Sequence, residues 1–303
     1  MKALITGAHG FVGRYLAEEL RSNGYEVSGT DIRGGWTHVD LLDFVCVKNY
    51  MQSERPGIIF HLAGQSAVGL SWKEPQMTFS INVNATLNLL DAARELPAPA
   101  RVLLIGSGDE YGKTDGAAPI KETAPLKPET PYAVSKCAQE EMARLYTRAY
   151  GMDIVLTRSF NHTGPQQRRG FVVPDFASQI AAIEKGGDPV LKVGNLSAER
   201  DFSDVRDVAR AYRLLAEKGR TGEIYNVGAG KACRIRDLLD ILLSYAGRKI
   251  DVRQDAAKMR PVDVPVIVSD ITKLQKDTGF AAEYTIEETL RDTLDYWRKQ
   301  NES

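Results

Sequence analysis

The segment KALITGAHGFVGRYLAEEL (residues 2–20) decides the fold of this chain, because in it a short apolar run leads into a glycine-rich turn and an amphipathic stretch. Gly7, Gly10 and Gly13 have the spacing GxxGxxG. Glycine allows a tight turn and lets the backbone approach a pyrophosphate, which meets the exposed N–H groups at the start of the following helix. The segment therefore predicts a dinucleotide-binding turn. The alternative is a turn that only packs the helix on the strand.

A carboxylate at the end of the next apolar run strengthens this prediction. Asp31 stands 18 residues beyond Gly13, where an acidic side chain can accept the ribose hydroxyls of adenosine. Asp31 disfavours a 2′-phosphate and so favours NAD(H), but Arg33 could neutralise such a phosphate, so NADP(H) stays open. The predicted cofactor-binding residues are Gly7, His9, Gly10, Phe11, Val12, Gly13, Asp31, Ile32, Arg33, Asp40, Leu41, Leu62, Ala63 and Gly64. His61 is predicted to be a packed strand residue instead.

Apolar runs alternate with amphipathic stretches through the first half of the chain, which predicts βαβ units and a parallel sheet. We expect strands at 3–6, 26–30, 57–62, 101–105 and 223–227, and helices at 11–22, 80–96, 130–150, 204–217, 236–246 and 286–300. The segment 161–175 is expected to be a long polar loop. The fold class is therefore α/β, with a Rossmann-type doubly wound parallel sheet and a smaller, discontinuous C-terminal substrate-binding lobe. A cofactor domain is expected over 1–160 plus about 203–229, and the lobe over about 161–202 plus 230–303.

Composition excludes several classes of partner. Lysine plus arginine (39) nearly equals aspartate plus glutamate (40), so we expect no nucleic acid and no anionic membrane among the partners. An anionic ligand must then be held by local groups. The three cysteines have no CxxC spacing, and no apolar run approaches the roughly 18 residues of a membrane span. These features predict a cytoplasmic protein with no disulfide framework and no metal site.

A second group of residues indicates proton transfer. Tyr132 and Lys136 are four residues apart near a predicted helix start, hence on one face of the helix. An ammonium close to the phenol is expected to lower the pKa of Tyr132 and make it a usable general acid. Ser107 follows the apolar run 101–105 at the carboxyl edge of the sheet, where ligands of such folds bind. Ser107, Tyr132 and Lys136 are the predicted catalytic residues, and the last two are also expected to contact the cofactor.

Motifs along nearly the whole chain resemble the extended short-chain dehydrogenase/reductase family, which acts on nucleotide sugars. They are GAHGFVG (7–13), HLAG (61–64), NVNAT (82–86), SGDEYG (107–112), YAVSK (132–136), RSFNHTGP (158–165), DVRDVARAY (204–212) and YNVGAG (225–230). The resemblance implies that Ser107, Tyr132 and Lys136 act while a hydride moves between nicotinamide and a sugar carbon. It also implies that Asn82 mainly orders the sheet around the site.

The second half is most similar to the branch of the family that acts on GDP-mannose derivatives. The segments 161–165, 171–176, 193–196, 200–202 and 260–263 carry this resemblance. It implies a GDP-sugar substrate, with a base enclosed by Val173 and 192–196 and a diphosphate held by Arg200 and Arg260, in keeping with the fit of guanidinium groups to phosphate. The predicted substrate-binding residues are Ser107, Asp109, Glu110, Asn161, Val173, Lys192, Asn195, Arg200 and Arg260.

Two reactions within that branch compete. A reductase reduces the C4 ketone of the 4-keto-6-deoxy sugar, with Tyr132 protonating the developing alkoxide. A 4,6-dehydratase also needs a carboxyl acid/base two residues beyond the Ser/Thr, where its members carry Glu and this chain has Asp109, with Glu110 displaced by one position. This difference favours reduction, to the 6-deoxy sugar or to its C4 epimer, since the sequence does not fix which face of the sugar receives the hydride. Another epimerase or dehydratase of the family stays open, and so does a non-catalytic dinucleotide sensor.

The family also implies an oligomer. Its members pair subunits by packing two helices from each into a four-helix bundle. The helices expected at 80–96 and 130–150 are the candidates here. A homodimer is therefore expected, unless the apolar faces of both helices are used on the sheet.

Overall fold

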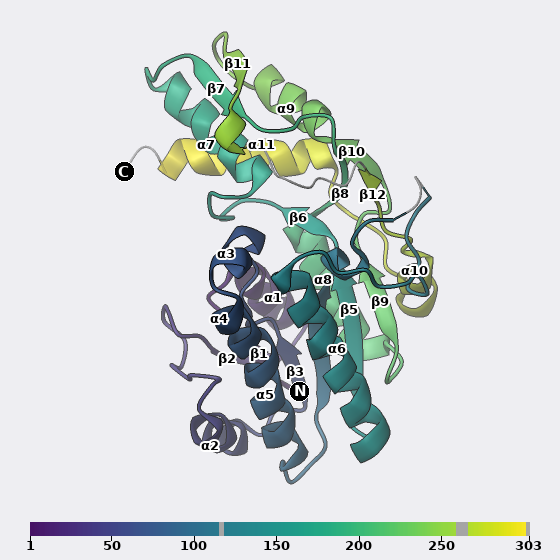
Figure 1. Cartoon of the computed structure of the whole chain (residues 1–303). Coiled ribbons are helices and arrows are strands. Elements are labelled where there is room, and N and C mark those ends of the chain that lie inside the picture. Colours follow the sequence, from purple (N-terminus) through teal and green to yellow (C-terminus); the bar gives the residue numbers. More distant parts are fainter. Residues whose placement is uncertain (115–117, 259–265, 301–303) are drawn as a thin grey trace.

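The computed structural model describes residues 1–114, 118–258 and 266–300, and Figure 1 shows a larger part built on a parallel sheet with a smaller lobe above it. Six strands lie in the order β2-β1-β3-β4-β5-β9. They are β1 (Lys2–Thr6), β2 (Glu26–Thr30), β3 (Ile58–His61), β4 (Arg101–Ser107), β5 (Ile154–Ser159) and β9 (Ile224–Val227). Every neighbouring pair is parallel, and the order reverses between β1 and β3. The predicted α/β fold with a doubly wound sheet is confirmed.

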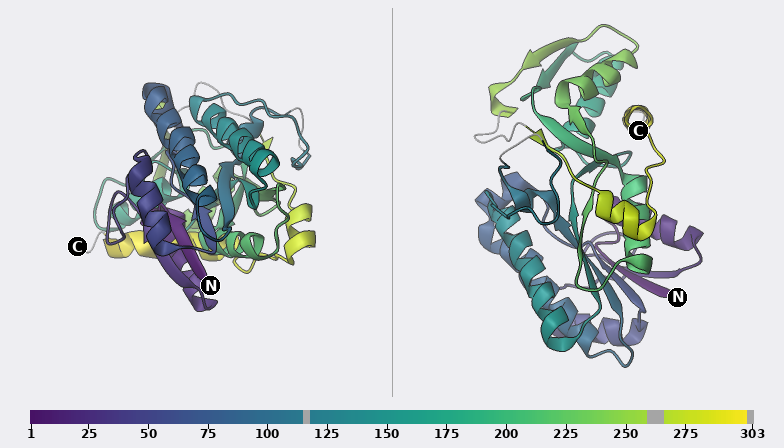
Figure 2. Two further views of the ribbon diagram at one scale, coloured as in Figure 1. Left: turned by 90° about the horizontal axis from the view of Figure 1, so that it is seen from below. Right: turned by 90° about the vertical axis from the view of Figure 1, so that its right-hand side faces the viewer.

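Helices cover both faces of this sheet (Figure 2). One face packs on α1 (Phe11–Ser22), α8 (Val205–Lys218) and α10 (Thr272–Thr278), and the other on α2 (Phe44–Glu54), α5 (Ala85–Arg94) and α6 (Pro131–Tyr150). The ends of α6 follow from its sequence: the Thr130 hydroxyl accepts the Ala133 N–H at 3.0 Å, Pro131 occupies the first turn, and Gly151 closes the helix at φ +67°.

The helix expected at 80–96 has a different beginning. The short helices α3 (Val68–Lys73) and α4 (Pro75–Phe79) lead into a π-helical turn, Ser80–Asn84, before α5 starts. Such turns are rare and often occur at functional sites. Here the turn carries Asn82, whose side chain is fully buried.

The lobe has its own core. It is formed by α7 (Val172–Glu184), α9 (Ile235–Ser244) and α11 (Ile286–Gln300) with β7 (Val190–Val193) and β11 (Asp251–Gln254). A second small sheet joins β10 (Ala232–Arg234), β8 (Glu199–Asp204) and β12 (Val266–Ile267), and β6 (Asn161–Thr163) pairs with β8. The prediction of a long loop over 161–175 is wrong, because this stretch contains β6 and the start of α7.

The predicted boundary of the lobe also needs correction. Leu274, in α10, and Phe280 belong to the core of the larger part, so the assignment of all of 230–303 to the lobe is wrong for this segment. Within the described residues, no helix combines the length and the apolar composition that crossing a bilayer requires.

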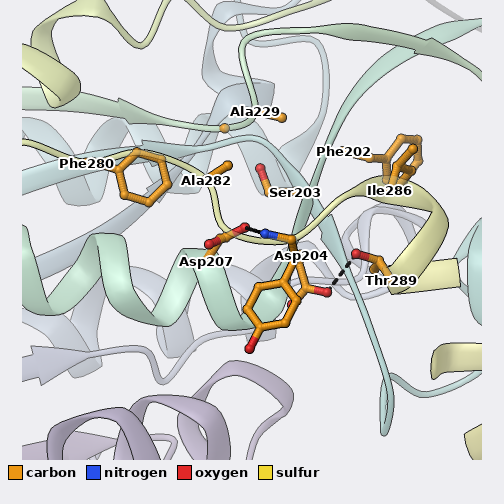
Figure 3. A pocket seen from close by; sticks show the side chains of 11 residues that line it. Phe202, Ser203, Asp204, Asp207, Ala229, Phe280, Ala282, Ile286 and Thr289 are labelled. Carbon is orange, nitrogen blue, oxygen red and sulfur yellow. Dashed lines mark hydrogen bonds between the residues drawn. The ribbon is translucent and has the colours of Figure 1, made fainter. Parts of the chain in front are cut away.

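Two buried aspartates of β8 join segments that are distant in the sequence. Asp201 accepts the N–H groups of Ala229 (2.7 Å), Gly230 (3.1 Å) and Ser269 (3.0 Å). Asp204 accepts the Thr289 hydroxyl at 2.7 Å, beside a pocket of about 30 Å³ that none of the predicted site residues lines (Figure 3). This pocket has room for about one water molecule, so it is a gap at the junction and no ligand site.

Candidate active site at the carboxyl edge of the sheet

The turn between β1 and α1 is packed so closely that positions 7 and 13 have room for glycine only. A Cβ added at Gly7, where φ is +71°, would lie 2.9 Å from the Ala63 nitrogen, and one at Gly13 would lie 2.4 Å from the Gly7 carbonyl oxygen. The first turn of α1 has no side-chain cap, so its N–H groups can meet an anion. The structure therefore brings the residues 7–13 and 62–63 together in a cradle that fits the pyrophosphate of a dinucleotide.

Asp31 links this cradle to the end of β2. One carboxylate oxygen accepts the His9 N–H and the other the Arg33 N–H, both at 3.0 Å. A carboxylate has about four lone-pair positions, so Asp31 can still accept ribose hydroxyls. The side chains of Ile32 and Arg33 are exposed beside it.

The other residues predicted along the cofactor are placed by local contacts. The Asp40 carboxylate accepts the Leu42 N–H at 2.9 Å, and the Leu41 carbonyl accepts the amide of Asn88 on α5. Phe11 stacks on His162, with ring centroids 6.0 Å apart. His61 is buried between the hydroxyls of Thr6 and Thr86, as expected for a packed strand residue.

Ser107 and Tyr132 meet where β4 ends and α6 begins. The Ser107 hydroxyl lies close enough to the phenol to lower the pKa of Tyr132. Burial and the nearby charge of Asp109 act in the opposite direction and prevail, so the pKa of Tyr132 is raised. The phenol therefore keeps its proton at neutral pH.

Lys136 lies beside the same corner. Its ammonium donates to the Ile105 carbonyl and to the Gln139 side chain, both at 2.8 Å, and a Cβ added at Gly64 would be 3.7 Å from it. Burial lowers the pKa of Lys136. The expectation that Lys136 brings down the pKa of Tyr132 is wrong for the protein alone, since burial of the phenol outweighs any such effect.

A polar network behind α6 holds these groups in place. Asn82 donates to the Gln65 carbonyl at 3.1 Å and to the Ser135 hydroxyl at 2.9 Å, and its own oxygen accepts the Gln65 N–H at 2.7 Å. It joins the loop after β3 to α6, in agreement with the ordering role that the resemblance implies. Gln139, the partner of Lys136, carried no signal in the sequence because an interior helix glutamine belongs to no motif.

Asp109 and Glu110 are consecutive residues of the short 3-10 helix η2 (Gly108–Tyr111) and differ in exposure. Asp109 is partly exposed and close enough to Tyr132 to raise its pKa. Glu110 is fully buried, and its side chain accepts the Ser107 N–H at 2.7 Å. The prediction that Glu110 contacts the substrate is therefore wrong.

The substrate residues predicted in and beside the lobe lie on several segments, of which β6 with Asn161 pairs with β8, the strand of Arg200. Asn161 follows β5 just beyond Ser159, the register partner of Ser107, and is exposed. Val173 is fully buried in the lobe core, so its predicted contact with the base is wrong.

The remaining lobe residues lie on three segments. Lys192 is exposed on β7, Asn195 lies in the turn that follows, and Arg200 is partly buried on β8. Side chains alternate across a strand, so Arg200 points away from the face on which Asp201 binds backbone amides. Arg260 and the segment 260–263 lie outside the described residues.

With this geometry in place, comparison with known proteins defines the class. The model of the GDP-mannose 4,6 dehydratase family matches residues 33–293, and the chain belongs to this family. The membership expected from the motifs, in the GDP-mannose branch of the extended short-chain dehydrogenases/reductases, is confirmed.

Individual relatives are similar over the full length. The GDP-6-deoxy-D-mannose reductase of Pseudomonas aeruginosa is 34% identical over 99% of this chain and 98% of its own. The structure of RMD from Pseudomonas aeruginosa complexed with NADPH has a TM-score of 0.91 at 34% identity, covering 99% of both chains. A UDP-glucose 4-epimerase of Thermus thermophilus in complex with NAD has a TM-score of 0.87 at 30% identity, covering 98% of this chain and 99% of its own. The predicted class of NAD(P)-dependent enzyme is thereby confirmed.

Proposed function

We propose that this protein reduces the C4 ketone of GDP-4-keto-6-deoxy-D-mannose with NADH or NADPH, giving GDP-6-deoxy-D-mannose. The observation that carries the proposal is the adjacent Ser107 and Tyr132 side chains beside Lys136 at the carboxyl edge of the sheet. Its support is the full-length similarity to a GDP-6-deoxy-D-mannose reductase.

The protein residues divide the work of reduction. A bound nicotinamide supplies the hydride. Tyr132, which keeps its proton because burial raises its pKa, donates that proton to the oxygen at C4 as negative charge develops there. Ser107 donates a hydrogen bond to the same oxygen, and Lys136 brings a positive charge close to it. A protonated phenol suits reduction, whereas oxidation would need a phenolate base.

We assign the two ligands to the two parts of the molecule. The turn 7–13, Asp31 and 62–64 hold the dinucleotide, with Lys136 at its nicotinamide end. Asn161, Lys192, Asn195 and Arg200 hold the GDP-sugar from the lobe side. Arg260 belongs to this set by resemblance alone.

Two incubations test the proposal. The purified protein is given GDP-mannose alone, and separately the 4-keto-6-deoxy sugar nucleotide with NADH or NADPH. Consumption of reduced cofactor in the second tube only is the expected result. A keto product formed from GDP-mannose, with no net change in cofactor, would show that the chain is a dehydratase.

Dehydration is the second candidate because Asp109 lies near Tyr132. Its carboxylate could act on the C5 and C6 groups if the sugar came within its shorter reach. The variant Asp109→Asn separates the two reactions. A reductase keeps most of its turnover in this variant, while a dehydratase loses the acid/base that elimination requires.

We further propose a cytoplasmic homodimer that forms a four-helix bundle from α5 and α6 of each subunit. Large apolar side chains are exposed on α6 (Val134, Leu145 and Tyr150) and on α3 and α4, which precede α5 in the chain (Leu70, Trp72, Met77 and Phe79). Such a patch is typical of an interface. Sedimentation that finds only a 33.5 kDa species at micromolar concentration would contradict the dimer.

A further inference from the structure

A buried ionic cluster lies directly behind the Ser107–Tyr132 pair and has no role in the reaction proposed above. Glu110 from η2 and Glu140 from α6 are 0% and 3% exposed. Arg158 from β5 binds Glu140 with two hydrogen bonds of 2.8 and 2.7 Å, and its Nε is 3.7 Å from Oε2 of Glu110. The guanidinium therefore hydrogen-bonds Glu140, whereas Glu110 faces Arg158 at 3.7 Å and the charge of Lys136 without a hydrogen bond from either cation.

The two oxygens of Glu110 have different surroundings. Oε1 accepts the Ser107 N–H at 2.7 Å and lies so close to the strand that a Cβ added at Gly106 would be 2.7 Å from it. Oε2 is buried and has no hydrogen-bond donor among the described residues. A charged carboxylate oxygen in that position would carry a large desolvation penalty, whereas a protonated one can itself donate a hydrogen bond.

The neighbouring charges agree with a proton on this oxygen. Burial and the neighbouring carboxylate of Glu140 raise the pKa of Glu110, against the Ser107 amide and Arg158, which lower it. Two neighbouring buried carboxyl groups repel each other unless one of them is protonated. Glu140 is the one held charged, because it accepts two bonds from Arg158, while Oε2 of Glu110 has no partner in the part of the chain that the structure describes. The titratable and charged groups that face Glu110 are Tyr132, Lys136, Cys137 and Glu140 on α6, Arg158 on β5, and Asp109 on its own segment.

We propose that Glu110 is a positioning residue that works as a neutral carboxylic acid: its O–H donates to Glu140 while its other oxygen fixes the Ser107 amide. This arrangement holds the Ser107 hydroxyl next to Tyr132. Because the carboxyl group of Glu110 is neutral, Asp109 contributes negative charge near the phenol and Glu110 does not. The inference rests on the proposed reduction, in which Tyr132 is the proton donor.

Two substitutions separate geometry from charge. Glu110→Gln can keep both interactions, because its oxygen accepts from Ser107 and its N–H₂ group donates to Glu140. Glu110→Leu keeps the volume and loses both. We expect Glu110→Gln to retain kcat within about threefold and Glu110→Leu to lose about thirtyfold or more in kcat, with little change in KM for the reduced cofactor.

An infrared measurement tests the proton without any substrate. The carbonyl stretch of a protonated carboxyl group should be present at neutral pH in the wild-type protein and absent in Glu110→Gln. Asp207→Asn is the matched control, since Asp207 is also buried and accepts the backbone N–H groups of Glu283 and Tyr284, away from Tyr132. This control should keep the band and the kcat, even where it lowers the midpoint of thermal unfolding.

Each outcome has one meaning. A band that survives in Glu110→Gln, or a Glu110→Gln variant as slow as Glu110→Leu, overturns the neutral positioning role. If Glu110→Leu does not fold, Glu110→Gln and the infrared band still decide. A wild-type protein that leaves the keto sugar unreduced refutes the proposed function instead, and the infrared comparison remains valid.

Discussion

In the cofactor turn, one continuous run of seven residues builds the site with its backbone, whereas in the lobe the segments are held together by buried carboxylates. Gly7 and Gly13 bring the turn against β3 and the start of α1. Asp201, by contrast, joins backbone at 229–230 and at Ser269, segments 28 to 68 residues away in the sequence.

The difference shows what each region can tolerate. At the turn, the absence of a side chain is the functional feature, so the smallest added group is harmful. At the lobe junction, a charged acceptor surrounded by N–H donors is the feature, so a change of the same shape but different hydrogen bonding is harmful. The catalytic corner lies between the two regions and depends on both.

The strongest test removes the proton donor while both regions stay intact. Tyr132→Phe should lower kcat by about 10² to 10⁴, since no other group can protonate the C4 oxygen as well, while the Kd for the cofactor stays unchanged. Stopped-flow reduction and fluorescence titration with NADPH measure the two quantities. Tyr225→Phe, another buried phenol whose hydroxyl binds Asp277, is the control and should affect stability only. Loss of cofactor binding in Tyr132→Phe would show that this residue acts mainly as a structural support.

The next test breaks the backbone side of the comparison. A Cβ in Gly13→Ala would lie 2.4 Å from the Gly7 oxygen and 2.8 Å from Ala8 backbone atoms, which cannot move without opening the cradle. We expect the Kd for NADPH to rise about tenfold or more, with destabilisation of about 1–3 kcal/mol as in other overpacked sites. Gly69→Ala is the matched control, because no atom lies within 4 Å of its added Cβ. Normal cofactor affinity in Gly13→Ala would contradict the tight turn.

The third test breaks the carboxylate side. In Asp201→Asn, one carboxylate oxygen becomes an N–H₂ group, which would face either the N–H of Ala229 or those of Gly230 and Ser269, at a cost of about 1–3 kcal/mol. We expect a higher KM for the sugar nucleotide and an unchanged Kd for NADPH. Asp240→Asn, on the exposed side of α9, should change neither. An equal loss of affinity for the sugar nucleotide and for NADPH would mean that the two regions are disturbed together, as one unit.

The smallest effect concerns an ion pair inside the lobe. Nη2 of Arg298 on α11 lies 2.8 Å from Oε1 of Glu184 on α7. The hydrogen bond from Arg298 is the main cause that lowers the pKa of Glu184 below its ordinary 4.5. The stability that this pair contributes is therefore present above pH 4.5 and is lost as the pH falls through the lowered value. Because both side chains are partly exposed, we expect less than about 1 kcal/mol. The free energy of unfolding, measured with urea at several pH values, should fall less steeply below pH 4.5 in Glu184→Gln than in the wild-type protein. An unchanged pH dependence would show that this pair does not contribute to stability.

Much of the sheet could be predicted from sequence because its strands are buried on both faces. Strands such as β1 and β3 are therefore short, mostly apolar runs, and α6 has a capping threonine, a first-turn proline and a final glycine. β5 (IVLTRS) is not among the expected strands, because its second half is polar although it is buried. The lobe strands could not be found in this way. β11 has the sequence DVRQ and is mostly exposed, so its existence depends on pairing with β7, far away in the chain.

The candidate site divides in the same manner. The catalytic motif could be predicted because Tyr132 and Lys136 are one helical turn apart, a relation that the sequence contains. The assignments of Glu110 and Val173 to the substrate are wrong because both side chains are buried, whereas the preceding residues, Asp109 and Val172, are partly exposed. A local sequence pattern does not show which of two adjacent side chains is buried.

The sequence by itself determined the class of fold, the cofactor turn and the Ser–Tyr–Lys set, because each depends on residues close together in the chain or on the burial of a whole strand. Only the tertiary structure decided which carboxyl group stands beside Tyr132 and which is buried behind Ser107. It also decided that α10 packs with the cofactor part and that Asp201 holds the lobe together. These features depend on contacts between distant segments, whose energies come from burial and from the pairing of polar groups that no local pattern records.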